Sequence, residues 1–361
     1  MKRFILVGAD PAAGNVDHPG GQLTASDGLI RYGQQHGIAI EVIDTTQSSF
    51  PVPSLKARVK KGLARLKRLN RMLSTDNYDG VIIFSSSGFS FYERILLAAL
   101  CRLKGVKAMF FMRSGHFINA VNASWVQRQL STWLLKLPFR IGAQGRPWID
   151  FYRSLGIPEK KLCIVRNWIS FDFPIAQQPR HSAAITRINF VFVGWLVEAK
   201  GVPQLLAAAE KLKDRYQFTL TLIGGGTLSE LAKQKAEAGL AEHLKVLGWQ
   251  DKKQVQQHLA NADVFVLPSA AEGFPNALLE AMATGLPAIC TNVGAISDSL
   301  YDNVNGFLLE NNSTECIVRA METYLKQPEL LALHSKNTLE IFNQQHGWEA
   351  NCSHLFDQFS E

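Results

Sequence analysis

The chain has 361 residues, 47% of them hydrophobic, and a formal net charge of +7. This length is enough for two domains of ordinary size, and the composition is that of a globular chain. Five cysteines, an odd number without a CxxC pair, argue against a disulfide framework or a thiolate metal site and favour a reducing, cytoplasmic setting. The opening MKRFILVGAD holds too short an apolar run for a signal peptide or a membrane span.

Apolar runs alternate with segments of helical periodicity along the first half of the chain, which is typical of parallel sheets built from βαβ units. The predicted strands of this half are Phe4–Val7, Ile38–Ile43, Val81–Phe84, Ala108–Met112 and Leu162–Val165. Gly20 and Gly21 follow the first strand, where a glycine loop lets the backbone approach a ligand.

Residues 54–71 concentrate the positive charge, with eight Lys or Arg and no acid. Apolar residues recur at helical spacing through residues 55–73, which predicts an amphipathic helix with an apolar stripe and a basic face. That face is either a solvated face of a domain helix or a surface for an anionic membrane and a membrane-bound acceptor. The candidate membrane residues are Lys56, Lys60, Lys61, Arg65, Lys67 and Arg68. No nucleic-acid motif accompanies them, so no nucleic acid is expected as a partner.

A second segment, Trp125–Leu137, combines two tryptophans and paired leucines with Arg128 and Lys136. Taken alone, this composition favours a helix that faces the core of its domain over one that contacts a membrane. Its tryptophans are therefore expected to be buried.

The second half of the chain repeats the alternation of strands and helices. Its predicted strands are Ile188–Val193, Phe218–Ile223, Leu244–Leu247, Val264–Leu267, Ala288–Thr291 and Gly306–Leu309. We therefore predict two doubly wound α/β domains, residues 1–170 and 188–345. Residues 171–187, polar and with two prolines, form the linker between them. A final helix in residues 346–361, from Trp348 to Phe359, is expected to cross back to the first domain.

Two carboxylates with seven residues between them, Glu272 and Glu280, stand out in the run EGFPNALLEAMATGLPAICTNVGAISD. A strand, a glycine turn and a helix over 276–284 are predicted there, and the start of such a helix suits a phosphate or diphosphate. Beside an anion, carboxylates serve as acceptors for neutral hydroxyls, so the ligand would carry both sugar hydroxyls and phosphates. The alternative is a pair of ordinary helix carboxylates.

Other polar and glycine positions fall at the same edge of the predicted second sheet. Lys200, in FVGWLVEAKG, is placed to pair with a diphosphate. Glycines follow three successive strands, at Gly194, Gly224–Gly226 and Gly248. Because the carboxyl ends of parallel strands share one edge, these positions are expected to converge on a cleft between the two domains.

These motifs resemble those of the GT-B-fold glycosyltransferases of glycosyltransferase family 4, which are retaining and use nucleotide sugars. The resemblance rests on FVGWLVEAKG, LIGGGTLSELA, the block from Glu272 to Gly294, and NGFLL. In the first half it is thinner and rests on GGQ at 20–22, the strand spacing and RNWIS at 166–170.

The resemblance implies a role for each matching residue. Glu272 would contact the donor sugar, Glu280 the ribose hydroxyls and Lys200 the diphosphate, together with backbone amides at Gly273, Phe274, Asn276 and Ala277. Gly21 would lie near the donor phosphates. Trp195 stands where the family has a second phosphate cation, for which Arg113 or Arg166 could substitute. His116, in a loop after a first-domain strand, or else Arg113, would contact the donor sugar. The residues expected to act in catalysis are His116, Glu272 and Lys200.

The expected reaction is sugar transfer from a nucleotide diphosphate sugar, such as a UDP-sugar, to a hydroxyl of a glycan or polyprenyl-linked glycan in bacterial surface polysaccharide synthesis. No cofactor and no metal are expected, because the chain lacks an Asp-x-Asp triplet. The enzyme would be cytoplasmic or peripheral at the cytoplasmic face of the inner membrane. Two alternatives remain: a nucleotide-sugar 2-epimerase of the same fold, and a non-catalytic module that binds sugar nucleotides or lipid.

Overall fold

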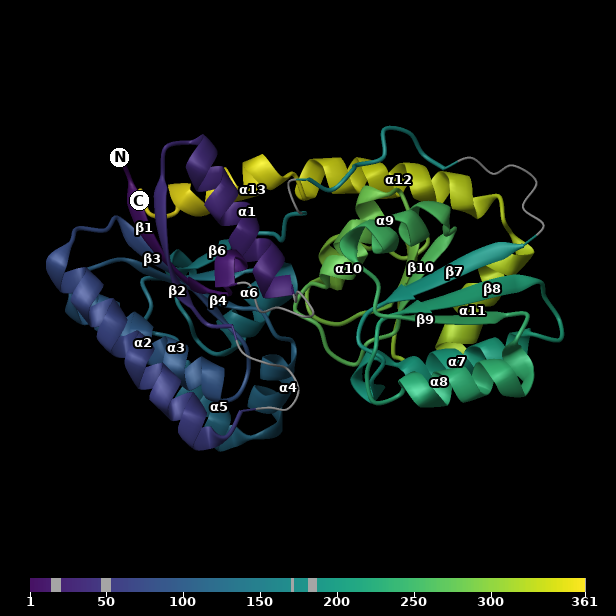
Figure 1. Cartoon of the computed structure of the whole chain (residues 1–361), viewed down its shortest axis with the longest axis horizontal. Helices are drawn as coiled ribbons and strands as arrows, with labels where there is room; N and C mark the ends of the chain where they lie inside the picture. Colours follow the sequence, from purple (N-terminus) through teal and green to yellow (C-terminus); the bar gives the residue numbers. More distant parts are fainter. Residues whose placement is uncertain (14–20, 47–52, 170–171, 181–186, 361) are drawn as a thin grey trace. The chain divides into compact units, whose positions relative to one another are not determined.

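The computed structural model describes residues 1–13, 21–46, 53–169, 172–180 and 187–360. Its contacts divide the chain into two compact units, Met1–Phe171 with His346–Glu361, and Asp172–Gln345. Each unit is built on one six-stranded sheet in which all pairings are parallel. Figure 1 shows helices on both faces of each sheet. The α/β class and the two doubly wound sheets predicted from the sequence are confirmed.

The first sheet has the spatial order β2-β1-β3-β4-β5-β6, so the direction of winding reverses between β1 and β3. Its strands are β1 (Arg3–Gly8), β2 (Ala39–Asp44), β3 (Gly80–Ser85), β4 (Ala108–Met112), β5 (Arg140–Ala143) and β6 (Leu162–Ile164). Its α-helices are α1 (Gly21–Gln35), α2 (Leu55–Thr75), α3 (Phe89–Leu103), α4 (His116–Ala123), α5 (Trp125–Leu134), α6 (Arg146–Ser154) and α13 (Trp348–Asp357).

Strand β5 was not among the five strands predicted for this half. It is only four residues long and contains an arginine and a glycine, so its sequence has no apolar run. Gly142 pairs with Phe111 of β4, and a Cβ at Gly142 would lie 1.9 Å from the ring of Phe111. The glycine that hides the strand in the sequence is therefore needed to accommodate the neighbouring phenylalanine.

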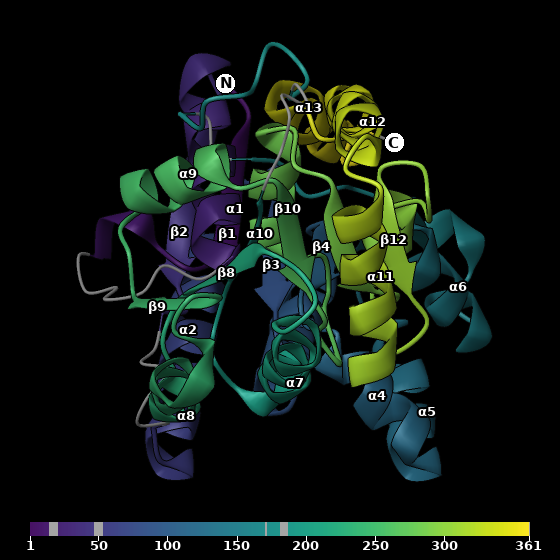
Figure 2. The same cartoon turned by 90° about the vertical axis from the view of Figure 1, so that its right-hand side faces the viewer.

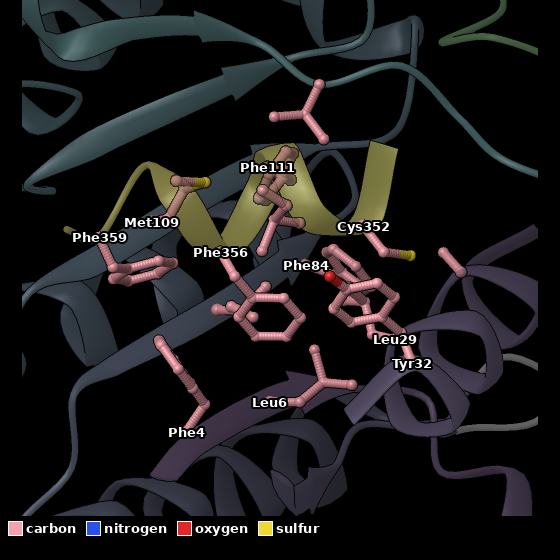
Figure 3. Close-up of a cluster of buried hydrophobic side chains, with 14 of the residues drawn as sticks. Phe4, Leu6, Leu29, Tyr32, Phe84, Met109, Phe111, Cys352, Phe356 and Phe359 are labelled. Atoms are coloured by element: carbon pink, nitrogen blue, oxygen red, sulfur yellow. The ribbon is translucent and has the colours of Figure 1, made fainter. Parts of the chain in front are cut away.

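Helices α1 and α13 cover one face of the first sheet. Phe4 of β1 lies edge-on to Phe356 and Phe359, with both ring centroids 5.0 Å away, and Figure 3 shows these rings in one buried cluster with side chains of β1, β3, β4 and α1. Tyr32 of α1 stacks on Phe356 at 5.6 Å. The last described residues of the chain thus complete the core of the first unit.

The second sheet has the order β12-β11-β10-β7-β8-β9, with its reversal between β7 and β10. Its strands are β7 (Ile188–Val193), β8 (Phe218–Ile223), β9 (Leu244–Gly248), β10 (Val264–Leu267), β11 (Ala288–Thr291) and β12 (Gly306–Leu309), so all six predicted strands are confirmed. Its α-helices are α7 (Val202–Leu212), α8 (Ser229–Lys235), α9 (Lys252–Asn261), α10 (Asn276–Ala283), α11 (Thr314–Lys326) and α12 (Leu330–Gln345).

Residues 172–180 of the predicted linker are held on the second unit. The Arg180 guanidinium donates to the backbone carbonyls of Leu259, Ala260, Ala262 and Thr284, at the carboxyl ends of α9 and α10. A cation at this position satisfies carbonyls that the helices leave unpaired and is favoured by the helix dipole. The rest of the predicted linker includes residues 171 and 181–186, which lie outside the described residues.

Candidate functional site

Lys200 and Glu272 meet where the winding of the second sheet reverses. Lys200 ends a short 3-10 turn after β7, and Glu272 lies in the loop after β10. Lys200 Nζ lies 2.5 Å from Glu272 Oε1, and the Ser269 hydroxyl donates to the same oxygen at 2.7 Å. Glu272 is only 9% exposed, so these two donors, and not bulk water, stabilise its charge. Open α/β sheets bind their ligands at this point of reversal.

The loop that carries Glu272 is fixed on both sides. Ala270 N donates to Ala199 O at 2.9 Å, and Ala295 N donates to Gly273 O at 2.8 Å. Gly294 has φ +61°, and a Cβ there would lie 2.2 Å from the carbonyl oxygen of Glu272. A side chain at position 294 would therefore push the Glu272 loop away, and glycine is required for this close approach.

Helix α10 begins directly after this loop, at Asn276, with no acid in its first turn. Its first amide groups have no acceptor within the helix and carry a partial positive charge, which suits an anionic ligand. Gly273 and Phe274 are buried ahead of the helix, and Asn276 and Ala277 are half-buried at its start. The predicted diphosphate amides thus lie in one continuous loop and helix start beside Lys200.

Glu280 lies one turn into α10, between Leu279 and Ala281. Burial raises the pKa of its carboxyl to about 7, and the Lys252 ammonium opposes this shift only in part. A carboxyl that is half-buried among apolar neighbours is costly to ionise, so a ligand that donates hydroxyl hydrogen bonds to it would stabilise the charged form.

The predicted glycines line the edge beyond Lys200. Gly194 N donates to Ile223 O, and a Cβ at Gly224 (φ +135°) would lie 1.9 Å from Gly194 O, so the loops after β7 and β8 touch through bare backbone. Gly248 ends the next strand, β9, and its carbonyl oxygen accepts a hydrogen bond from Gly224 N at 2.8 Å. Trp195, which replaces the arginine of the resembling family, lies edge-on to Trp249 with centroids 4.7 Å apart. This edge is therefore aromatic where the family has a cation.

In the first unit, a polar cluster lies at the carboxyl ends of β4, β5 and β6. Arg113 donates to the Asn167 side-chain oxygen at 3.2 Å, and the Gln144 amide donates to the same oxygen at 3.0 Å. The His346 ring contacts the Asn167 carbonyl at 2.9 Å, and burial lowers the pKa of this histidine to about 4. Burial also lowers the pKa of Arg113, to about 10, and its guanidinium lies over the Phe84 ring.

The other predicted residues of the first unit occupy separate positions. His116 is exposed and is the first residue of α4, directly after the strand end that carries Arg113. Gly21 is exposed and begins α1, whereas Gly20 lies outside the described residues. The structure therefore brings Lys200, Glu272 and the start of α10 together, and it places His116, Arg113 and Gly21 on the other unit.

The predicted basic surface on α2 needs one correction. Arg65 does not face the surroundings: its Nε lies 2.6 Å from Glu93 Oε1 of α3, and only 14% of its side chain is exposed. Lys56, Lys60, Lys61, Lys67 and Arg68 are exposed, and Arg68 also donates to Val42 O at 3.0 Å. Sequence spacing missed this because the partner acid lies on another helix. In the part of the chain that the structure describes, we find no helix with the length and apolar character of a membrane span.

Several residues of these sites were missed by the sequence reasoning. Ser269 carries no motif signal, and Gln144 follows β5, the strand that was not predicted. Asn167 stands in RNWIS, so its position after a predicted strand was a usable signal. The five cysteines are buried thiols without disulfides, and no cluster of three or more acidic, histidine or cysteine side chains suited to a metal occurs among the described residues.

Comparison with known proteins places this geometry in a class. A solved structure of Anabaena HepE in complex with UDP and glucose superposes with a TM-score of 0.72 over 100% of both chains, at 15% identity. With two doubly wound parallel sheets, the chain has the GT-B fold. The family model described as glycosyl transferases group 1 matches residues 176–340, within the second unit. The sequence similarity to this family thus lies in the second unit.

Curated relatives agree with this assignment. The putative teichuronic acid biosynthesis glycosyltransferase TuaC of Bacillus subtilis is 36% identical over 134 residues, 37% of this chain and 32% of TuaC. The UDP-Gal:alpha-D-GlcNAc-diphosphoundecaprenol alpha-1,3-galactosyltransferase of Escherichia coli is 25% identical over 322 residues, covering 84% of this chain and 81% of that protein. Six further curated relatives are matched over about half their length, between 45% and 52%.

Proposed function

We propose that the chain is a retaining glycosyltransferase of family 4 that moves a sugar from a UDP-sugar to a hydroxyl of a glycan or polyprenyl-linked glycan in bacterial surface polysaccharide synthesis. The observation that carries the proposal is the Lys200–Glu272 pair beside the start of α10, at the reversal point of the second sheet. The bound UDP and glucose of the HepE structure support the donor, and the name of the Escherichia coli relative supports a lipid-linked acceptor.

The donor would enter this site by opening the ion pair. Its diphosphate offers Lys200 a more highly charged partner than Glu272 does, and the amides at the start of α10 bind the same group. Glu272, still held by Ser269, is then available to accept hydrogen bonds from sugar hydroxyls. Glu280 would accept from the ribose hydroxyls of the nucleotide.

In the transfer step, the bond between the anomeric carbon and the diphosphate oxygen breaks, and its electron pair stays on the diphosphate. Lys200 and the α10 amides stabilise this growing charge, the kind of electrostatic contribution that is large in many enzymes. The acceptor hydroxyl attacks from the same face and forms the new bond, while its proton passes to a departing phosphate oxygen. His116 would contact the donor sugar, and no step requires a metal.

The acceptor would be reached at an anionic membrane through the exposed lysines of α2. Each basic residue near an anionic lipid surface contributes about 1 kcal/mol of attraction. The proposed location of the enzyme is the cytoplasmic face of the inner membrane.

A thermal-shift screen of nucleotide sugars tests the donor site. A ligand at 100 times its Kd stabilises the folded state by about 2.7 kcal/mol, so a UDP-sugar is expected to raise the unfolding temperature. Glu280→Ala should remove this shift, whereas Glu230→Ala, an exposed glutamate of α8, should leave it unchanged. A UDP-sugar shift that survives Glu280→Ala would contradict the proposed ribose contact.

Incubation with a UDP-sugar alone separates the proposed transferase from the other two activities. NMR of the donor should show no isomerised sugar without an acceptor, whereas a 2-epimerase would produce one. Addition of a polyprenyl-linked glycan should then release UDP. A protein that binds the donor but releases no UDP with any acceptor would be a non-catalytic module.

A further inference from the structure

Helix α5 exposes apolar side chains that the sequence predicted to be buried. The exposed fractions are 73% for Trp125, 67% for Val126, 42% for Leu130 and 64% for Trp133, while Ser131 is the only fully buried residue of the helix. The expectation of a core-facing helix is therefore wrong. We call these four side chains the α5 patch. Single exposed apolar residues are common, but two tryptophans and two aliphatic residues on one ten-residue helix mark an interaction surface.

Helix α5 lies in a basic stretch of the sequence. Residues 94–149 contain nine Lys or Arg and no Asp or Glu, including Arg128 on α5 and Lys136 just after it. Lys136 is exposed, and Arg128 donates to the Ser154 carbonyl at 2.7 Å. Basic residues on and next to the helix complement an anionic partner.

A second surface of the same chemistry lies on the amino-terminal half of α2. Leu55, Val59 and Leu63, spaced four residues apart on one face, are 64%, 41% and 55% exposed, and Lys56, Lys60 and Lys61 flank them. In both Figures 1 and 2 this half of α2 and helix α5 lie at the same end of the first unit. The apolar stripe predicted for α2 is therefore split, and its first half is left uncovered.

We propose that the α5 patch inserts into the interfacial layer of an anionic lipid bilayer, with the exposed residues of the amino-terminal half of α2 as a second contact. Indole rings with one apolar and one polar end favour this layer, and flanking Lys and Arg bind the anionic headgroups. This inference rests on the membrane contact within the proposed function and adds an inserting element to it. A second copy is a poorer occupant, because the first unit has a net charge of +11 and two such surfaces would repel.

The position of α5 connects this surface to the carboxyl edge of the first sheet. Helices α4 and α5 form the crossover from β4 to β5, separated only by Ser124, and α4 begins at His116. A crossover leaves from the carboxyl edge of its sheet, where Arg113 and His116 lie. A lipid-linked acceptor held at the bilayer would thus approach the edge that carries these two residues.

Sedimentation with sucrose-loaded vesicles tests the proposal with Trp125→Ala/Trp133→Ala. Wild-type protein should bind vesicles of phosphatidylcholine with phosphatidylglycerol, and part of this binding should persist at high salt, because apolar insertion is not screened as charge is. The double variant should bind at least tenfold more weakly and lose the salt-resistant part. The matched control is Leu231→Ala/Leu333→Ala, which removes two exposed apolar side chains of the second unit and should bind as wild type does.

Tryptophan fluorescence of the wild-type protein gives a readout that does not depend on the variant folding. Brominated phosphatidylglycerol should quench the emission, and the quenched component should be absent from the spectrum of the double variant. Absence of quenching in wild type, or equal vesicle binding by the double variant, would overturn the proposal. Light scattering that shows a dimer lost in the double variant, without lipid binding, would assign the patch to self-association instead. The thermal shift with a UDP-sugar should be preserved in the double variant. This measurement tells a failure of the membrane proposal apart from a failure of the proposed donor site.

Discussion

The two units of this chain differ most in how they use charge. The first unit carries 24 Lys or Arg and 13 Asp or Glu, a net charge of +11, whereas the second carries 14 and 18, a net charge of −4. In the second unit the important cation, Lys200, is half-buried and paired with Glu272. In the first unit most lysines of α2 are exposed, and the only ion pair of that helix in the described structure is the inward-facing Arg65–Glu93 pair.

This difference fits the different tasks proposed for two similar folds. Both sheets are doubly wound, and among the described residues the second sheet holds the Lys200–Glu272 pair at its reversal point, which suits a small, highly charged ligand. The first spreads its charge over helix surfaces, which suits a large anionic partner at long range. The net charge of +7 suggests a uniformly basic chain, but the division into units separates a basic first unit from an acidic second unit.

The largest effect is expected from a substitution that removes the Lys200–Glu272 ion pair of the second unit. Lys200→Met keeps the alkyl chain and removes the cation, so the rate of UDP release should fall by about 10² to 10³, the usual loss when one stabilising donor is removed. Lys211→Met, which removes an exposed lysine paired with Glu315, should leave the rate unchanged. Thermal unfolding checks that both variants fold. A loss of less than tenfold would argue against a catalytic role for Lys200.

The next effect addresses the exposed charge of the first unit. Lys60→Glu/Lys61→Glu should weaken binding to anionic vesicles by roughly 2 kcal/mol or more, at about 1 kcal/mol per basic residue, and the difference should shrink with added salt. The thermal shift with a UDP-sugar should not change. Lys233→Glu/Lys253→Glu, on the second unit, is the control for overall charge. Equal weakening by both pairs would mean that net charge, not the α2 surface, drives the binding.

A smaller effect concerns the pH dependence of stability. Because burial raises the pKa of Glu280 to about 7, the folded protein binds a proton that the unfolded chain has already lost between pH 4.5 and 7. The free energy of unfolding should therefore fall with rising pH in this window. Glu280→Gln should remove about 1 to 2 kcal/mol of that fall, as measured by denaturant unfolding at several pH values. Parallel profiles for wild type and Glu280→Gln would show that this carboxyl has an ordinary pKa.

The smallest expected effect is that of chelation. EDTA should change the rate of UDP release by less than twofold, since the proposed stabilisation of the diphosphate comes from Lys200 and backbone amides. If EDTA abolished the activity and Mg²⁺ or Mn²⁺ restored it, the metal-independent step would be contradicted. A metal ion would then stabilise the diphosphate together with Lys200.

The sequence predicted regular elements well where apolar runs are bounded by glycine or proline. All six strands of the second sheet follow this rule, and β5 does not, because Gly142 makes room for Phe111 from a neighbouring strand. The Glu272 block and Lys200 were found because their spacing along the chain carries the motif. Ser269 was not found, since its role depends on a loop geometry that no local pattern encodes.

Surface properties were predicted least well, because periodicity does not reveal which face of a helix a neighbour covers. An apolar stripe was predicted on α2 but not what covers it: α3 packs against part of this stripe, and Leu55, Val59 and Leu63 stay exposed. Arg65 was assigned to the surface and is instead paired with Glu93. In both cases the deciding contact comes from α3, some thirty residues away in the sequence.

The position of α13 sets an order on synthesis of the protein. Its Phe356, with Phe359 just beyond the helix, covers Phe4 of β1, and a Cβ at Gly80 would clash with the Phe359 ring, so the core of the first unit includes residues that follow the second unit in the chain. On the ribosome, the complete second unit emerges before these residues do. The first unit can thus complete its core only after the second unit has been translated, because one face of its sheet stays uncovered until α13 has been made.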